Sequence, residues 1–355
     1  MALYVSSTVR LSLLVLSSLI GTALISAGPR PLPSGHWEFT QIHMGVPVRI
    51  VLYAGNRAAA ESAASAAFAR IAHLDRMMSD YRPDSELRQL ERRAGEPVPV
   101  SRELLEVLAH ACEIARATGG AFDPTVAPLV ALWRQARTTR RLPDRAAIEQ
   151  ARASVGWHRL QIDARNSSIR LPAGMRLDLG GIAKGYILQE ALITMRGVDV
   201  TSALVESGGD IVVGEAPPQR RGWHVATPGA DVEFARRASA LTNAALATSG
   251  PTAQFVEIDG VRYSHVVDPR TGMALTGDAV ARVIAPDGAT ADALATALTV
   301  LSREGAPAVR ARFPRVFFSI SSRNSTPLQN LHKGDSPLKG TVPFPGKGAP
   351  PPPAV

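Results

Sequence analysis

The chain has 355 residues, of which 45% are hydrophobic and 20% are charged. This composition is typical of one large or two ordinary globular domains, and it excludes disordered and fibrous proteins. The formal net charge of +8 is concentrated at the ends: residues 321–355 hold four Lys and Arg against one Asp, and residues 1–30 hold two Arg. Because the body is nearly neutral and aromatic residues make up only 5%, we expect no nucleic-acid partner. The single Cys112 excludes an internal disulfide and a cysteine-based metal site.

Two terminal segments are expected to lie outside the folded body. Residues 1–28 contain Arg10, the apolar run LSLLVLSSLIGTALISA and small residues around Ala27, which is the pattern of a signal peptide. The run is also near the lower length limit for a membrane span, so a retained N-terminal anchor is an alternative. Either interpretation predicts an exported protein, in the periplasm or attached to the outer face of the inner membrane. Residues 321–355, rich in Pro, Gly, Ser and Lys, are predicted to form a disordered tail.

Residues 36–320 are expected to form one functional unit, and hydrophobic patterns predict its elements. Two alternating runs around Gly45, over residues 36–52, predict a strand pair, and Asn56 can cap a long helix over residues 57–79. A helix is predicted over residues 102–118, a short helix begins at Asp144, and residues 160–171 predict a hairpin.

The second half of this unit is predicted to be richer in strands. The expected elements are a helix over 182–195, strands over 203–207 and 211–214, a strand at Trp223, a hairpin over 255–267 with a type I′ turn at Asp259-Gly260, a strand over 279–285, a helix over 290–301 capped by Thr290, and a strand over 315–320. Frequent hairpins favour an α+β fold, with a mixed, largely antiparallel sheet and packed helices, over a doubly wound nucleotide-binding fold.

The segment DLGGIAKG, residues 178–185, is a candidate anion site. Two glycines lead directly into a helix that holds Lys184, and free backbone amides at a helix start bind anions such as phosphate. The segment lacks both the Walker and the GxGxxG spacing. A tight turn followed by a solvated Lys184 is the simpler alternative for these residues alone. Asp178 would need a metal or a polar ligand group beside it to offset its repulsion of a phosphate.

The segment ATADALATALTVL is a candidate metal site. Asp292 and Thr296 lie four residues apart, so both side chains project from one face of the predicted helix. A carboxylate and a hydroxyl are hard oxygen ligands suited to Mg²⁺. Alternatively, Asp292 only complements the dipole of the first helical turn and Thr296 only packs.

Two further segments could carry chemistry. In RYSHVVDPRTG, His265 and Asp268 stand at a strand end before a proline, where His265 can serve either as a general base or as a turn-stabilising residue. In GGAFDPTV, the following proline keeps Asp123 out of a helix, so we expect a shaped loop with an exposed carboxylate. Tyr81, directly after the long helix, is able to stack on a planar ring.

Together these segments resemble the FAD:protein FMN transferase family, the ApbE-like flavin transferases. The matching motifs occur in the family's order and span about residues 36–320: MG at 44–45, MSDY at 78–81, GGAFDPTV at 119–126, DLGGIAKG at 178–185, SGGD at 207–210, ATSG at 247–250, YSHVVDPRTG at 263–272 and ADALATAL at 291–298. Eight ordered motifs are far more specific than any one of them.

The resemblance implies a role for each matching position. The residues implied to hold FAD are Met44, Tyr81, Ala121, Phe122, Asp123, Asp178, Lys184 and Val267, with Val266 as an alternative to the last. The implied metal ligands are Gly181 through its carbonyl and Asp292 and Thr296 through their side chains, with the Ala289 carbonyl as a possible fourth. His265 matches the residue that assists transfer. Two positions depart from the family pattern: Pro251-Thr252 replaces an acidic-aromatic pair, and Glu206 replaces Asn.

The implied activity is the transfer of FMN from FAD to a Thr or Ser hydroxyl of a partner protein. A phosphoester forms, AMP is released, and Mg²⁺ is the implied cofactor. The implied acceptor carries a flavinylation motif and is a membrane redox subunit. An FAD pyrophosphatase, in which water replaces the hydroxyl, and a non-catalytic flavin-binding protein are the two alternatives.

Overall fold

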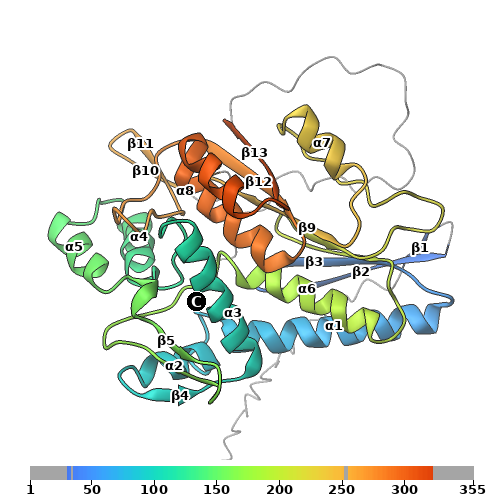
Figure 1. Cartoon of the computed structure of the whole chain (residues 1–355), viewed down its shortest axis with the longest axis horizontal. Helices are drawn as coiled ribbons and strands as arrows, with labels where there is room; N and C mark the ends of the chain where they lie inside the picture. The colour runs from blue at the N-terminus through green and yellow to red at the C-terminus, as the bar shows by residue number, and fades with distance from the viewer. Residues whose placement is uncertain (1–29, 33–34, 252–254, 323–355) are drawn as a thin grey trace, which may run out of the picture.

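The computed structural model describes residues 30–32, 35–251 and 255–322. Its main feature is an eight-stranded sheet in the order β1-β2-β3-β7-β8-β9-β12-β13, in which every neighbouring pair is antiparallel (Figure 1). The strands are β1 (Arg30–Leu32), β2 (His36–His43), β3 (Val46–Tyr53), β7 (Ala203–Ser207), β8 (Asp210–Val213), β9 (Ala244–Ser249), β12 (Ala279–Ala285) and β13 (Phe317–Ser322). The predicted α+β fold with a largely antiparallel sheet is confirmed.

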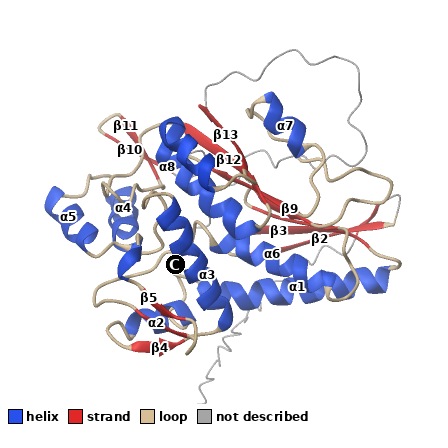
Figure 2. Cartoon of the chain, viewed as in Figure 1, coloured by secondary structure: helices blue, strands red, loops and turns tan. Residues whose placement is uncertain are grey.

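Eight α-helices accompany the sheet in the described part of the chain (Figure 2). They are α1 (Arg57–Met78), α2 (Glu86–Arg92), α3 (Arg102–Ala117), α4 (Ala127–Thr139), α5 (Arg145–Ala153), α6 (Ala183–Arg196), α7 (Val232–Ala238) and α8 (Gly288–Arg312). No described helix is both long and apolar enough to cross a membrane.

The sheet separates two apolar layers because successive side chains of a strand point to opposite faces. Val205, Val212 and Val283 belong to the large core that also contains the buried faces of α1, α6 and α8. Their strand neighbours Leu204 and Ile284 point the other way, into a smaller core that includes residues of α7. The large core therefore fixes α6 and α8, the two helices that carry the predicted phosphate and metal residues.

Smaller elements gather beside one end of the helical layer (Figure 2). Helices α4 and α5 share an apolar cluster with the hairpin of β10 (Phe255–Ile258) and β11 (Val261–Ser264), in which Trp133 stacks on Tyr263 with 5.1 Å between ring centroids. A separate three-stranded sheet has the order β4-β6-β5, with β4 at Pro97–Pro99, β5 at Gln161–Asp163 and β6 at Ser168–Arg170.

The two turns that the sequence marks by glycine have the expected geometry. Met44 and Gly45 join β2 to β3 with φ angles of 53° and 73°, and Asp259 and Gly260 join β10 to β11 with φ angles of 51° and 75°. Positive φ at both central residues is characteristic of a type I′ turn. The side chain of Asn56 caps α1 by accepting a hydrogen bond from the Ala59 amide at 2.9 Å, as predicted.

Several predicted boundaries are wrong. Trp223 forms an isolated bridge to Leu241 and no strand. Helix α8 is capped by Asp287, whose Oδ1 accepts from the Thr290 amide at 2.8 Å, so Thr290 lies within the first turn. The same helix continues to Arg312 beyond a non-helical Ser302. Helices α2, α4 and α7 are additional to the elements predicted from the pattern.

The single cysteine is buried on α3, and burial raises the pKa of the Cys112 thiol to about 12. A thiol that stays protonated at neutral pH is unreactive, which supports the absence of thiol chemistry. The predicted N-terminal segment and nearly all of the predicted tail lie outside the described residues, except that residues 321 and 322 complete β13.

Helices α6 and α8 touch through two glycines. A Cβ atom added to Gly185 would lie 2.0 Å from the Gly288 carbonyl oxygen and 2.9 Å from the Asp292 Cβ. We expect Gly185→Ala to destabilise the fold by about 1–3 kcal/mol, because the helix backbones would have to separate. Denaturant unfolding measures this, with Gly55→Ala as control because nothing lies within 4 Å of that position. Equal losses in the two variants would contradict the close crossing.

Candidate active site

The glycine pair of residues 180 and 181 precedes α6, as predicted. Ile182 is the N-cap residue with non-helical dihedral angles, and Lys184 is the second residue of the helix. The Asp178 Oδ1 accepts a hydrogen bond from the Gly180 amide at 2.8 Å, and the Asp178 amide donates to the Pro124 carbonyl at 2.8 Å. These two bonds fasten the glycine turn to the 121–126 loop, so two predicted FAD-binding segments lie side by side.

Lys184 stands between two carboxylates. Its ammonium group forms an ion pair with Asp210 and lies 3.7 Å from the Asp292 Oδ1. The other oxygen of Asp292 accepts a hydrogen bond from the Gly185 amide at 3.1 Å. The predicted phosphate residue of α6 and the predicted metal residue of α8 therefore meet where the two helices cross.

Gly181, Thr296 and Phe122 come together around the same point. A Cβ on Gly181 would lie 3.0 Å from the Thr296 Oγ1 and 3.3 Å from the Phe122 Cε2, so a larger residue here would crowd both side chains. Thr296 lies one helical turn after Asp292 on α8. The backbone of Gly181, the hydroxyl and the carboxylate are thus neighbours, and each offers a hard oxygen of the kind that Mg²⁺ prefers. Mg²⁺ fits this donor set.

The site does not rely on a cluster of classical metal-binding side chains. Among the described residues, no group of three or more His, Cys, Asp or Glu could hold a metal ion. Magnesium often takes only one or two protein carboxylates and completes its coordination with water and substrate phosphates. The donors around Gly181 are of that type, and their assignment as metal ligands stays a prediction.

The 121–126 loop differs from the prediction at Asp123. Ala121 and Phe122 are buried, but the Asp123 carboxylate is buried as well, so the expectation of an exposed carboxylate is wrong. It accepts hydrogen bonds from the Thr125 amide and hydroxyl, at 2.8 and 2.6 Å, and from the Trp157 amide at 3.1 Å. Burial raises the pKa of Asp123, and these hydrogen bonds oppose that shift. The side chain thus shapes the loop internally, and its contact with FAD stays a prediction.

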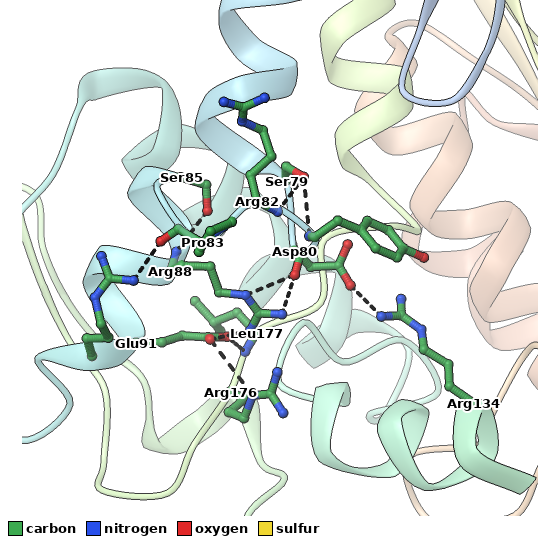
Figure 3. Close-up of polar contacts among 12 residues, drawn as sticks. Ser79, Asp80, Arg82, Pro83, Ser85, Arg88, Glu91, Arg134, Arg176 and Leu177 are labelled. Carbon is green, nitrogen blue, oxygen red and sulfur yellow. Dashed lines mark hydrogen bonds and ion pairs between the residues drawn. The ribbon is translucent and has the colours of Figure 1, made fainter. Parts of the chain in front are cut away.

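Tyr81 lies beside an arginine that the sequence analysis did not single out. The Tyr81 side chain is 78% exposed, and the Arg134 guanidinium carbon lies 4.9 Å from the centre of its ring. Figure 3 shows Arg134 reaching from α4 toward Asp80, with a hydrogen bond of 2.7 Å between Nη1 and Oδ2. Arg88 supports the same turn by donating to the Asp80 carbonyl at 2.9 Å.

Arg134 also connects this turn to the glycine segment. Its Nη2 lies 3.7 Å from the Asp178 Oδ2. Burial raises the pKa of the Asp178 carboxyl, while the Gly180 hydrogen bond and the positive charge of Arg134 lower it. The helical spacing of ALVALWRQA could have indicated α4, but no local pattern shows which of its arginines faces the site.

Met44 is hydrogen-bonded to the long helix α1. Its amide, in the β2–β3 turn, donates to the Asp75 Oδ2 at 3.0 Å. Asp75 lies one turn before the end of α1 at Met78, and Tyr81 follows shortly after that end. The hydrogen bond therefore fixes Met44 near the C-terminal end of α1.

His265 lies in an exposed position directly after β11. The next residue, Val266, is buried with Ala121 and Val300, which places the histidine loop against the 121–126 loop and against α8 one turn beyond Thr296. Val267 forms a bridge to Ala274. The loop thus borders the site formed by the other predicted segments.

Asp268, the other ionisable side chain at this strand end, is occupied. Its carboxylate accepts from the Arg270 amide and Nε, both at 2.9 Å, and from the Arg270 Nη2 at 2.8 Å. All three donors come from Arg270, so both carboxylate oxygens are already engaged by a neighbouring residue. His265 is therefore the better candidate for the base.

Glu206, which departs from the motif pattern, belongs to the sheet. It is buried on β7 and forms an ion pair with Arg49 of β3, directly across the strand pair. The Pro251-Thr252 departure is at the edge of the described residues, since Thr252 lies outside them. The Glu206 departure is thus balanced by a charge on the neighbouring strand.

Comparisons with known proteins agree on one family. A model described as the ApbE family matches residues 44–317. A protein of Treponema pallidum named FAD:protein FMN transferase is 32% identical over 295 residues, covering 78% of this chain and 82% of that protein. A protein of Vibrio cholerae with the same name is 34% identical over 238 residues, covering 65% of this chain and 71% of that protein.

Solved structures show the same relationship. The crystal structure of an ApbE protein from Thermotoga maritima superimposes with a TM-score of 0.70 at 30% identity, covering 81% of this chain and 96% of that one. The flavin transferase ApbE from Vibrio cholerae gives a TM-score of 0.71 at 27% identity, covering 82% and 94% of the two chains. With the family match over most of its length and this shared fold, the chain belongs to the ApbE family.

Proposed function

We propose that this protein is an FAD:protein FMN transferase that moves FMN from FAD to a Thr or Ser hydroxyl of an acceptor protein. The observation that carries this proposal is the meeting of Lys184 and Asp292 at the crossing of α6 and α8, beside the glycine turn at the start of α6. Family membership and relatives named for this activity support it.

We assign the binding of FAD and the metal to different residues of the site. Lys184 binds the pyrophosphate of FAD beside the glycine turn, because a cation attracts an anion. The expected free amides do not carry this role, since the amides of Ile182 and Ala183 both donate to the Leu179 carbonyl. Gly181, Asp292 and Thr296 would hold Mg²⁺. When bound, Mg²⁺ neutralises negative charge on the phosphates during phosphoryl transfer. Tyr81 and the 121–122 loop hold the ring systems of FAD.

His265 accepts the proton of the acceptor hydroxyl. The hydroxyl oxygen attacks the phosphorus of the FMN half, a new phosphoester bond forms, and the bond between this phosphorus and the bridging oxygen breaks. AMP leaves with that oxygen. An exposed histidine at a strand end is suited to this role because an incoming acceptor protein can reach it.

One experiment tests the proposal against its two rivals. The purified protein is incubated with FAD, Mg²⁺ and an acceptor protein carrying a flavinylation motif, and both AMP and the acceptor's mass are measured. We expect AMP release together with an FMN-sized mass gain. AMP release without labelling would instead show an FAD pyrophosphatase, and FAD binding with neither product would show a flavin-binding protein.

We further propose that residues 36–320 act outside the cytosol and that the acceptor is a membrane redox subunit. The support for export is the sequence of residues 1–28, which has the pattern of a signal peptide or anchor. The acceptor is proposed from the family resemblance. Fusing residues 1–35 to a reporter that folds only after export tests this. A reporter found only in the cytosol would contradict the proposed localisation.

Tyr81→Ala is expected to weaken FAD binding by about 1–3 kcal/mol, the usual contribution of an aromatic side chain stacked on a base. The Arg134 guanidinium lies over one face of the Tyr81 ring. Because Tyr81 is largely exposed, its other face is open to a ligand. Calorimetric titration with FAD measures the effect. Tyr81→Phe should retain most of the affinity, and unchanged affinity in the alanine variant would rule out stacking.

A further inference from the structure

Asp210 has no role in the resemblance-based assignment, yet it holds the predicted phosphate residue. It begins β8, directly after the Gly208-Gly209 turn, and its side chain is 3% exposed. One oxygen accepts a hydrogen bond from the Thr248 amide at 3.2 Å, and the other forms the ion pair with Lys184. A buried carboxylate on a central strand is therefore aimed at the ammonium group.

The charges around Lys184 are unbalanced. Asp210 and Asp292 are both almost fully buried, and Lys184 is the only cation that makes an ion pair with either of them among the described residues. One ammonium thus faces two carboxylates, which leaves a net negative charge. Charges taken out of water interact more strongly than exposed ones, because they are screened less.

The net negative charge around Lys184 opposes the binding of an anionic ligand. A pyrophosphate that approached Lys184 would have to replace Asp210 as its partner and would add negative charge beside both carboxylates. With a divalent cation bound to Asp292, the cluster of Lys184, Asp210, Asp292 and the cation would carry a net positive charge. We propose that Asp210 makes FAD binding depend on the divalent cation, because Asp210 competes with the pyrophosphate for Lys184. This inference rests on the FAD site of the proposed function.

The consequence is a mutual dependence between two ligands. By thermodynamic linkage, if the cation strengthens FAD binding, FAD strengthens cation binding by the same factor. Couplings between sites are typically about 5- to 150-fold. Removing the charge of Asp210 should strengthen FAD binding without a cation and thereby weaken the coupling. A residue that only supports the fold would not increase affinity when it is replaced.

The test uses the full-length protein and measures FAD affinity by calorimetry, once with EDTA and once with saturating Mg²⁺. We expect wild type to bind FAD about 10- to 100-fold more tightly with Mg²⁺. Asp210→Asn keeps an oxygen for the Thr248 amide and should bind FAD about tenfold more tightly than wild type in EDTA. The matched control is Glu206→Gln, which removes a buried carboxylate paired with Arg49 rather than with Lys184. It should retain the wild-type ratio.

The outcomes separate this inference from the proposed function. If Asp210→Asn keeps the wild-type ratio, or weakens FAD binding in EDTA, the role of Asp210 is wrong. Equal FAD affinity of the wild type with and without Mg²⁺ would overturn this inference alone. A protein that binds no FAD under either condition would overturn the proposed function as well. Riboflavin, which lacks phosphate, should bind with the same affinity in EDTA and in Mg²⁺.

Discussion

Replacing Asp292 by alanine is expected to lower FMN transfer on the order of 10³-fold at limiting Mg²⁺, with recovery only when Mg²⁺ is raised. A metal acting on phosphoryl oxygens contributes several kcal/mol to the transition state, and each 1.4 kcal/mol or so is a factor of ten. Asp292 is the one carboxylate in the predicted metal set, and it lies within 3.7 Å of the Lys184 ammonium. The measurement is the transfer rate as a function of Mg²⁺ concentration.

Asp292→Asn separates this role from a structural one. The asparagine oxygen can still accept the hydrogen bond from the Gly185 amide, which Asp292 accepts at 3.1 Å, so the crossing of α6 and α8 should stay intact. Only the charge is lost, and we expect the same requirement for raised Mg²⁺ as in the alanine variant. If the Mg²⁺ titration of either variant overlays that of wild type, Asp292 is not a metal ligand.

The sequence predicts the parts of this fold that depend on local chemistry. Glycines at Gly45 and Gly260 have positive φ, Asn56 supplies a cap, and helical or alternating spacing marks helices α1 and α3 and strands β2 and β3. The pattern did not indicate helix α4 or strand β9. Motif order then identifies the family, because several spaced motifs together are specific. Each turn, cap, element and single motif is decided by residues close together in the chain.

The features that sequence analysis missed depend on distant partners. Asp123 looks exposed beside a proline, but the amide of Trp157 and the side chain of Thr125 enclose it. In the sequence, Asp210 follows two glycines and shows no partner. The packing of α6 on the sheet brings Lys184 to it. The same holds for Arg134, which meets Asp80 across the space between α4 and the end of α1. Long-range packing, rather than local pattern, decides which charged groups become partners.

Replacing His265 is the second change for which we expect a large loss of transfer rate. We expect His265→Ala to lower the transfer rate by roughly 10² to 10⁴, the usual contribution of a positioned general base. Binding of FAD and Mg²⁺ should remain nearly intact, because His265 is exposed after β11 while the neighbouring Val266 anchors the loop in the apolar cluster with Ala121. Single-turnover AMP release and acceptor labelling, measured together, check this. The exposed His73 on α1 gives a matched control, since His73→Ala should keep wild-type rates.

The pH dependence of transfer distinguishes a base from a residue that only shapes the loop. A protonated imidazole cannot accept the hydroxyl proton, so wild-type transfer should fall as pH is lowered through the range in which the imidazole becomes protonated. The His265→Ala variant should lose this acid limb while FAD affinity stays level over the same range. Asp268 cannot readily replace the histidine, because its carboxylate already accepts three hydrogen bonds from Arg270. An acid limb that survives in the alanine variant would therefore show that the proton goes to a group other than these two.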